Sequence, residues 1–215
     1  MTPMTKAQAC RTIHRCATAY RDNLVNKNVL FVAERGDIRE YFEALFLSGN
    51  FLHLTGVDVA FSMTANAFYN LAVDDRLTVN DFRFTADGTS RMKLDVLPTL
   101  MKIHYTARMV GNYDGSGNYL MADKIAGTTT AAMGFVKDGF FYYPNSALKA
   151  DVKTITAKPF LKVSAVFIKG INDESYSNMT YIAKGMSITD IVKAPGVSGK
   201  LGLLPEAPQV EKTDH

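Results

Sequence analysis

The spacing of apolar residues predicts helices in the first half of the chain. Thr5 and Gln8 form a capping box, after which apolar side chains recur at helical spacing: Ile13, Cys16, Ala17, Tyr20 and Leu24. The same spacing returns at 64–71 and at 89–97, and a further short helix is expected near Thr78 or Asn80. Pro98 ends or kinks the helix before it.

Three segments between these helices differ in pattern. Residues 29–33 form a short apolar run with branched side chains, which predicts a buried strand. Residues 38–47 fit both the helical and the strand period, so either structure is possible. Residues 50–57 are apolar except for one histidine, one threonine and one glycine.

The second half of the chain has the composition and alternation of a sheet. Strands are expected within 103–113, 119–122, 132–136, 140–143, 161–169 and 176–183. Lys137-Asp138-Gly139 separates two of them and is a hairpin signal. From about Gly185 the pattern has no period, which predicts a single domain over residues 1–185 and a flexible C-terminal tail over 186–215. The predicted fold class is α+β, with N-terminal helices packed on an antiparallel sheet.

Composition agrees with a globular protein and excludes a membrane span. Of the 215 residues, 47% are apolar and 21% are charged, which is enough apolar material for one sizeable core. The formal net charge of +3 allows a nucleic acid as partner without arguing for one. No apolar run approaches the roughly 20 residues that a spanning helix needs.

Cysteine and histidine are too few for a complete metal site. Cys10 and Cys16 lie six residues apart on a helix and point in different directions, so they cannot form a disulfide. This favours a reducing, cytoplasmic location. Cys10 and His14 share a helix face, but no second pair completes four ligands. We expect no metal and no cofactor.

His53 is the histidine with the most suggestive surroundings. Its neighbours from Phe51 to Val57 are apolar or small. An imidazole held among apolar side chains loses solvation, which favours the neutral form that can act as a base near pH 7. In a strand, Thr55 would share its face and could orient the ring. The alternative is a core histidine bonded to a backbone carbonyl.

A second candidate lies in the predicted sheet. Tyr143, Asn145 and Ser146 combine an aromatic ring with short polar side chains, and basic residues follow at Lys149, Lys153, Lys158 and Lys169. Aromatic rings beside lysines suit single-stranded nucleic acid, where bases stack and ammonium groups meet phosphates. The alternative is tyrosines on a sheet face with solvated lysines.

Together these segments resemble a known family, the fourth phage-associated branch of the barnase–EndoU–colicin–RelE-like nucleases. The resemblance starts from Asn50-Phe51-Leu52-His53-Leu54-Thr55-Gly56-Val57 and covers roughly residues 25–185. Further matches follow in order: Phe68-Tyr69, Lys93-Leu94-Asp95-Val96-Leu97-Pro98, Ala132-Met133-Gly134-Phe135, Tyr143-Pro144-Asn145-Ser146, Asp151-Val152-Lys153, Lys169 and Tyr181.

The resemblance implies metal-independent cleavage of RNA by attack of the ribose 2′-OH, in a toxin or effector of a phage or mobile element. It makes His53 the general base or acid, with Thr55 as its polar neighbour. Ser146, Lys153 and Lys169 would contact phosphate and stabilise charge. The candidates for RNA binding are Tyr143, Asn145, Lys149 and Tyr181.

Two other functions remain open. A catalytically inactive protein with this fold could bind a host protein or RNA, for example to blunt defence. At Lys153 we would expect an arginine in the family, and lysine lacks its bidentate fork. A structural virion component is the third possibility. RNA is the expected partner, with a host or immunity protein as a further one, in the cytoplasm of a bacterial host.

Overall fold

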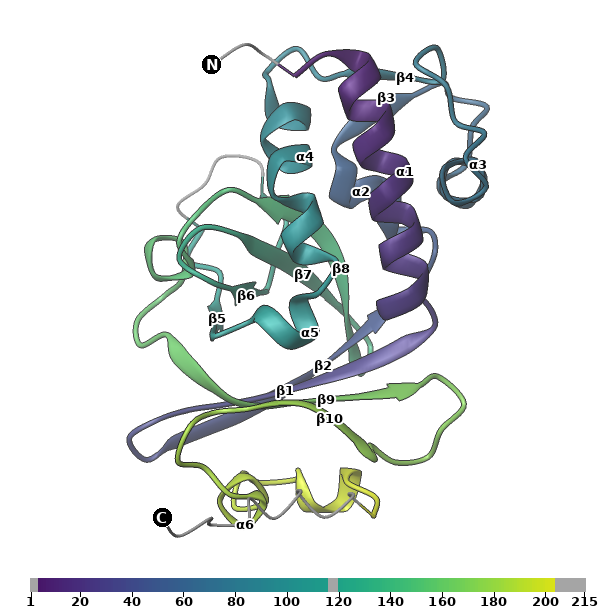
Figure 1. Ribbon diagram of the computed structural model, residues 1–215. Helices are drawn as coiled ribbons and strands as arrows, with labels where there is room; N and C mark the ends of the chain where they lie inside the picture. Colours follow the sequence, from purple (N-terminus) through teal and green to yellow (C-terminus); the bar gives the residue numbers. More distant parts are fainter. Residues whose placement is uncertain (1–3, 116–119, 204–215) are drawn as a thin grey trace, which may run out of the picture.

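The computed structural model describes residues 4–115 and 120–203 (Figure 1). Its α-helices are α1 (Lys6–Asn23), α2 (Asn50–Thr55), α3 (Ala65–Val73), α4 (Thr89–Leu100), α5 (Ile103–Thr106) and α6 (Ile188–Ile191). Its strands are β1 (Lys27–Arg35), β2 (Ile38–Phe46), β3 (Val57–Val59), β4 (Phe82–Phe84), β5 (Met109–Asn112), β6 (Lys124–Gly127), β7 (Ala132–Asp138), β8 (Phe141–Leu148), β9 (Leu161–Gly170) and β10 (Asn178–Ile182). Two 3₁₀ turns, η1 (Val152–Thr154) and η2 (Ser198–Lys200), complete the set.

Eight strands form one strongly curved sheet in the order β1-β2-β8-β7-β6-β5-β9-β10. Because β1 also pairs with β9, the first seven of these strands close into a ring. All pairings are antiparallel except a short parallel one between β2 and β8, where Ala44 lies opposite Tyr142. Strands β3 and β4 form a separate antiparallel pair.

Helices α1 to α4 lie together on one side of the sheet (Figure 1). The capping box begins α1 as expected, with Thr5 Oγ1 accepting from the Gln8 amide at 3.2 Å. Aromatic rings join the helices to the sheet: Tyr20 of α1 contacts Phe46 of β2, Phe51 of α2 and Tyr69 of α3. These rings belong to the main hydrophobic core.

The α+β class and the packing of N-terminal helices on a sheet are confirmed. The ambiguous segment 38–47 is a strand, because β2 pairs with β1 along its whole length. Three local predictions were wrong. Of the strand expected at 119–122, residues 120–122 are not in a strand, and β6 begins only at Lys124. No helix begins at Thr78: Asp81 accepts hydrogen bonds from the Thr78 amide and hydroxyl at 2.6 and 2.7 Å, which makes a turn before β4. Residues 103–106 form α5 rather than a strand.

The segment after residue 185 is packed over its described part. Ile191, Ala194 and Val197 are buried against β1 and β9 in a second hydrophobic cluster, so α6 covers the sheet face opposite to α1–α4 (Figure 1). The flexible tail predicted for 186–215 is therefore wrong for 186–203, and residues 204–215 lie outside the described part of the chain. That residues 1–185 form a single domain stays a prediction.

No helix within the described ranges has the length and apolar character needed to cross a membrane.

Candidate functional site

A groove of about 610 Å³ lies where α2, α4 and β8 meet. His53 comes from α2, Lys93 from α4, and Asn145 and Ser146 from β8. Three segments that are far apart in the sequence therefore bring an imidazole, an amine, an amide and a hydroxyl to one cavity.

Helix α2 positions His53 at the groove. Its first turn is held by Asn50, whose Oδ1 accepts from the Leu47 amide at 2.9 Å. Phe51 and Leu54 are buried in the core, which leaves His53 on the exposed side of the same helix. The helix ends at Gly56, whose φ of 63° lies in the left-handed region that favours glycine.

Gly56 also makes room for Lys93. A Cβ atom at this position would overlap Cδ of Lys93, so the aliphatic part of the lysine lies directly across the glycine. Its Nζ donates to the His53 carbonyl at 3.2 Å, close to the end of α2. Burial lowers the pKa of Lys93, and the nearby Asp87 carboxylate opposes that shift only in part.

A buried serine fixes α4 against the end of α2. Ser90 is fully buried, and its Oγ donates to the Gly56 carbonyl at 2.6 Å. The Thr85 amide in turn donates to Ser90 Oγ at 2.8 Å. These bonds hold Lys93, one turn further along α4, in a fixed place relative to His53.

The opposite wall is formed by β8. Asn145 Nδ2 donates to the Met121 carbonyl at 2.9 Å, which orients the amide. Ser146 is 5% exposed and lies deeper. No hydrogen bond joins its hydroxyl to another described residue, so the hydroxyl is available to a ligand in the groove.

Two carboxylates, Asp58 and Asp87, also line the groove. Hydrogen bonds from Thr89, including its amide at 2.9 Å, hold the pKa of Asp87 at about 2. Both groups repel a phosphate. The Lys93 ammonium group attracts a phosphate and opposes this repulsion.

The structure changes the predicted relation between His53 and Thr55. Because residues 50–55 are helical, side chains two positions apart point about 200° apart. Thr55 is buried and donates to the Leu52 carbonyl at 2.7 Å, whereas His53 is exposed rather than enclosed by apolar side chains. Thr55 thus stabilises the end of α2 and does not reach the groove.

The predicted basic residues do not gather in the groove. Lys153 and Tyr181 line a different pocket, together with Arg108. Lys169 donates to the carbonyls of Asp173 and Glu174 at 2.9 and 3.1 Å, which ties it to a turn.

The two remaining candidates also lie outside the residues that line the groove. Lys149 is exposed and forms an ion pair with Asp95 of α4. Tyr143 is half-buried on β8, opposite Val136.

Lys93 was missed as a site residue. It stood in the sequence only as part of the Lys93-Leu94-Asp95 match, without a role. The signal that could have identified it is Gly56 at the end of the His53 motif, because a glycine there leaves space for a long side chain from another helix. Nothing in the sequence alone shows that these two segments touch.

Metal ligands do not cluster in the described residues: no group of three or more His, Cys, Asp or Glu side chains is placed to hold an ion. Cys10 and His14 contact each other at 3.4 Å, and His14 also lies 2.9 Å from the carbonyls of Ala72 and Leu77. This pair connects α1 to the end of α3. It is a structural contact on a half-buried helix face.

Helices packed on a curved sheet, with imidazole, amine and carboxylate groups in one groove, define an α+β protein. Residues 12–185 match the model of a family described as phage-Barnase-EndoU-ColicinE5/D-RelE like nuclease 4. The chain belongs to this family of phage-associated nucleases, as the resemblance implied. The family suggests a nucleic acid as substrate. Comparisons with curated proteins and with solved structures give no match.

Proposed function

We propose that this protein is a metal-independent RNase that cleaves RNA by attack of the ribose 2′-OH in the groove between α2, α4 and β8. The observation that carries the proposal is the meeting of His53, Lys93 and Ser146 in one cavity of about 610 Å³. An imidazole can move a proton, an ammonium group can balance phosphorane charge, and a hydroxyl can hold a phosphate oxygen. The family adds support, because its members are nucleases.

The reaction needs two proton transfers. His53 accepts the proton of the 2′-OH, and the 2′ oxygen attacks the adjacent phosphorus. The bond to the 5′ oxygen then breaks, leaving a 2′,3′-cyclic phosphate, and the departing oxygen takes a proton from Lys93. Lys93 suits this role because burial lowers its pKa and makes the ammonium group a better acid. Ser146 and Asn145 donate hydrogen bonds to the non-bridging oxygens.

In this proposal the protein is an effector or toxin of a phage or mobile element that acts on RNA in the bacterial cytoplasm. A host or immunity protein would limit its activity. High toxicity on expression, reduced by His53→Ala, is the expected cellular result.

One observation favours a second candidate function, a nuclease fold that binds RNA or a host protein without cleaving. Among the described residues that line the groove, Lys93 is the single lysine or arginine. Lys153 and Lys169, expected to stabilise charge, lie elsewhere. A site with one cation stabilises a dianionic phosphorane less than a site with several.

Cleavage of total tRNA and of a mixed single-stranded RNA in EDTA separates the two functions. The proposal predicts cleavage by the wild type, products ending in a 2′,3′-cyclic phosphate, and loss of cleavage in His53→Ala. His53 is exposed, so this variant should keep the fold, as circular dichroism can check. A folded wild type that leaves both RNAs intact would support the binding function.

A further inference from the structure

A second surface, on β9 and its neighbours, combines cations and aromatic rings. One pocket of about 350 Å³ is lined by Arg108, Lys153, Phe160, Lys162 and Tyr181. A neighbouring pocket of about 440 Å³ shares Phe160 and Lys162 and adds Arg35 and Lys184. We call the two pockets together the β9 surface. None of its lining residues lines the groove of His53.

The β9 surface is rich in basic residues. It carries five lysine or arginine side chains, Arg35, Arg108, Lys153, Lys162 and Lys184, and a single carboxylate, Glu34. Glu34 lies 3.4 Å from Arg39, which balances its charge. Over the rest of the chain, basic and acidic residues are nearly balanced, 19 against 20. The β9 surface is therefore a local concentration of positive charge.

The cations are arranged around the rings. The guanidinium of Arg108 lies 4.0 Å from the ring centre of Tyr181, and its Nη1 donates to the carbonyls of Tyr105 and Ala107 at 2.7 and 2.9 Å. Those bonds hold the guanidinium over the ring. A fixed guanidinium or aromatic plane is a surface on which an unpaired base can stack.

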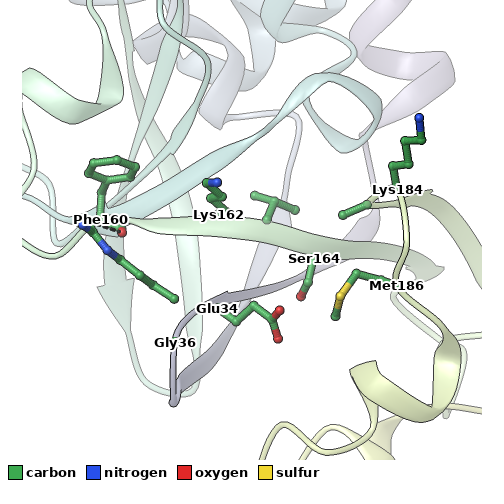
Figure 2. A pocket seen from close by; sticks show the side chains of 10 residues that line it. Glu34, Gly36, Phe160, Lys162, Ser164, Lys184 and Met186 are labelled. Atoms are coloured by element: carbon green, nitrogen blue, oxygen red, sulfur yellow. Dashed lines mark hydrogen bonds between the residues drawn. The ribbon is translucent and has the colours of Figure 1, made fainter.

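Phe160 has a similar environment. The Arg35 guanidinium and the Lys153 Nζ lie 5.0 and 5.7 Å from its ring centre. Figure 2 shows Phe160 at the start of β9, with the side chains of Lys162 and Lys184 pointing away from that of Glu34. The free ammonium groups thus face solvent on the side without the carboxylate.

The pocket with Arg108 has the shape and polarity for one base. Met109, Val163 and Ala183 form an apolar floor, while Arg108, Lys153 and Lys162 are exposed around it. The lining of this pocket includes no acidic residue. An apolar floor bordered by cations suits a planar base between two phosphates, and it suits a flat protein surface less well.

We propose that the β9 surface binds single-stranded RNA, at a site separate from the groove, with phosphates on Lys153 and Lys162 and one unpaired base beside Tyr181. This second proposal depends on the proposed function in one respect, namely that the nucleic acid is RNA. Its role is to hold the strand while another part of that strand, or another strand, occupies the groove.

Binding is tested by fluorescence anisotropy with a short labelled single strand of mixed sequence. Its 2′-O-methyl riboses prevent cleavage by 2′-OH attack, so affinity is measured whether or not the protein is an RNase. The double variant Lys153→Gln/Lys162→Gln should raise Kd about tenfold and reduce the slope of log Kd against log salt by about 1.4. The matched control Arg15→Gln/Lys137→Gln, which removes two exposed cations outside both pockets, should change Kd less than about twofold.

The base contact is tested with Tyr181→Leu, which keeps an apolar side chain. It should raise Kd at least about fivefold without changing the salt slope, because stacking is lost and no charge is removed. A duplex of the same sequence should bind more weakly than the single strand, since its bases are paired.

An equal loss of RNA affinity in the Lys153/Lys162 variant and in the control would overturn the proposal. It would also be overturned if the wild type bound the duplex as tightly as the single strand, or bound neither. If the wild type binds as described but cleaves no RNA, the β9 surface stands and the proposed RNase activity fails. If RNA is cleaved but Kd is insensitive to Lys153, Lys162 and Tyr181, the activity stands and the β9 surface fails.

Discussion

The groove and the β9 surface are both cavities of the same fold, but their lining residues differ in chemistry. Among its described lining residues, the groove contains one imidazole, one amine, one amide, three hydroxyl groups and two carboxylates. The β9 surface contains five cations and two aromatic rings. The groups proposed to exchange protons are thus separated from the basic surface proposed to bind RNA. Under the proposed function, the comparison teaches that basic residues, which are the most visible sign of a nucleic-acid protein in a sequence, need not mark the reacting centre.

Among the variants that test the difference between the two regions, Lys93→Met should have the largest effect on cleavage. The variant keeps the aliphatic contact with Gly56 and removes the single lysine or arginine among the described groove residues. We expect a loss of about 100-fold or more in kcat, because charge on the phosphorane is no longer balanced. RNA affinity, which we propose to be set by the β9 surface, should change little. A loss of affinity with kcat intact would reverse the assignment of the two regions.

A second prediction concerns the positioning of that lysine. Gly56→Ala places a methyl group where Cδ of Lys93 now lies, in a backbone conformation with φ of 63°. We expect a cost of about 1–2 kcal/mol in the free energy of unfolding, measured by urea denaturation, and a lower kcat from the displaced Nζ. Gly36→Ala, at φ 59° with open space around its Cβ position, is the matched control for backbone strain alone. Equal kcat in both variants would remove Lys93 from the mechanism.

The pH dependence of cleavage gives a third prediction. Burial lowers the pKa of Lys93 below that of an ordinary lysine. The ammonium form is therefore lost at a lower pH than in an ordinary lysine, and kcat should fall at a correspondingly lower pH as the pH rises. Lys93→Arg keeps its charge to higher pH but is a much poorer acid, so it should lower kcat and move this alkaline limb upward. An unchanged alkaline limb in the arginine variant would assign the limb to another group.

The smallest effect is expected at Lys149. This lysine is exposed, and the Asp95 carboxylate pairs with it. Since its charge is already balanced, Lys149→Gln should change RNA affinity less than about twofold, whereas Asp95→Asn should improve affinity slightly. The same anisotropy assay measures both. A tenfold loss in Lys149→Gln would extend the RNA site beyond the β9 surface.

The sequence predicted the architecture better than the site. The capping box at Thr5, the hairpin at Gly139 and the strand 161–169 are local signals, and each is in place. Residues 38–47 were ambiguous because their structure is decided by pairing with β1, which the local pattern does not contain.

The site depended on contacts between distant segments. The motif around His53 was visible, but its helical structure, which separates His53 from Thr55, was not. Lys153 was expected to contact phosphate and stabilise charge beside His53, and Tyr181 to bind RNA; the structure brings these two together in a pocket away from His53. Spacing along a chain cannot show which of several basic residues shares a cavity with a histidine. That depends on how α2, α4 and β8 pack.

The most direct test of the account is the cleavage rate of single-stranded RNA in EDTA at saturating RNA, compared among the wild type, His53→Ala and Arg15→Gln/Lys137→Gln. The account predicts that His53→Ala lowers the saturated rate by about 100-fold or more, in the range of general acid–base catalysis, while it still binds the 2′-O-methyl strand. The control should cleave at the wild-type rate. A His53→Ala variant that cleaves as fast as the wild type would contradict the assignment of the groove as the reacting centre.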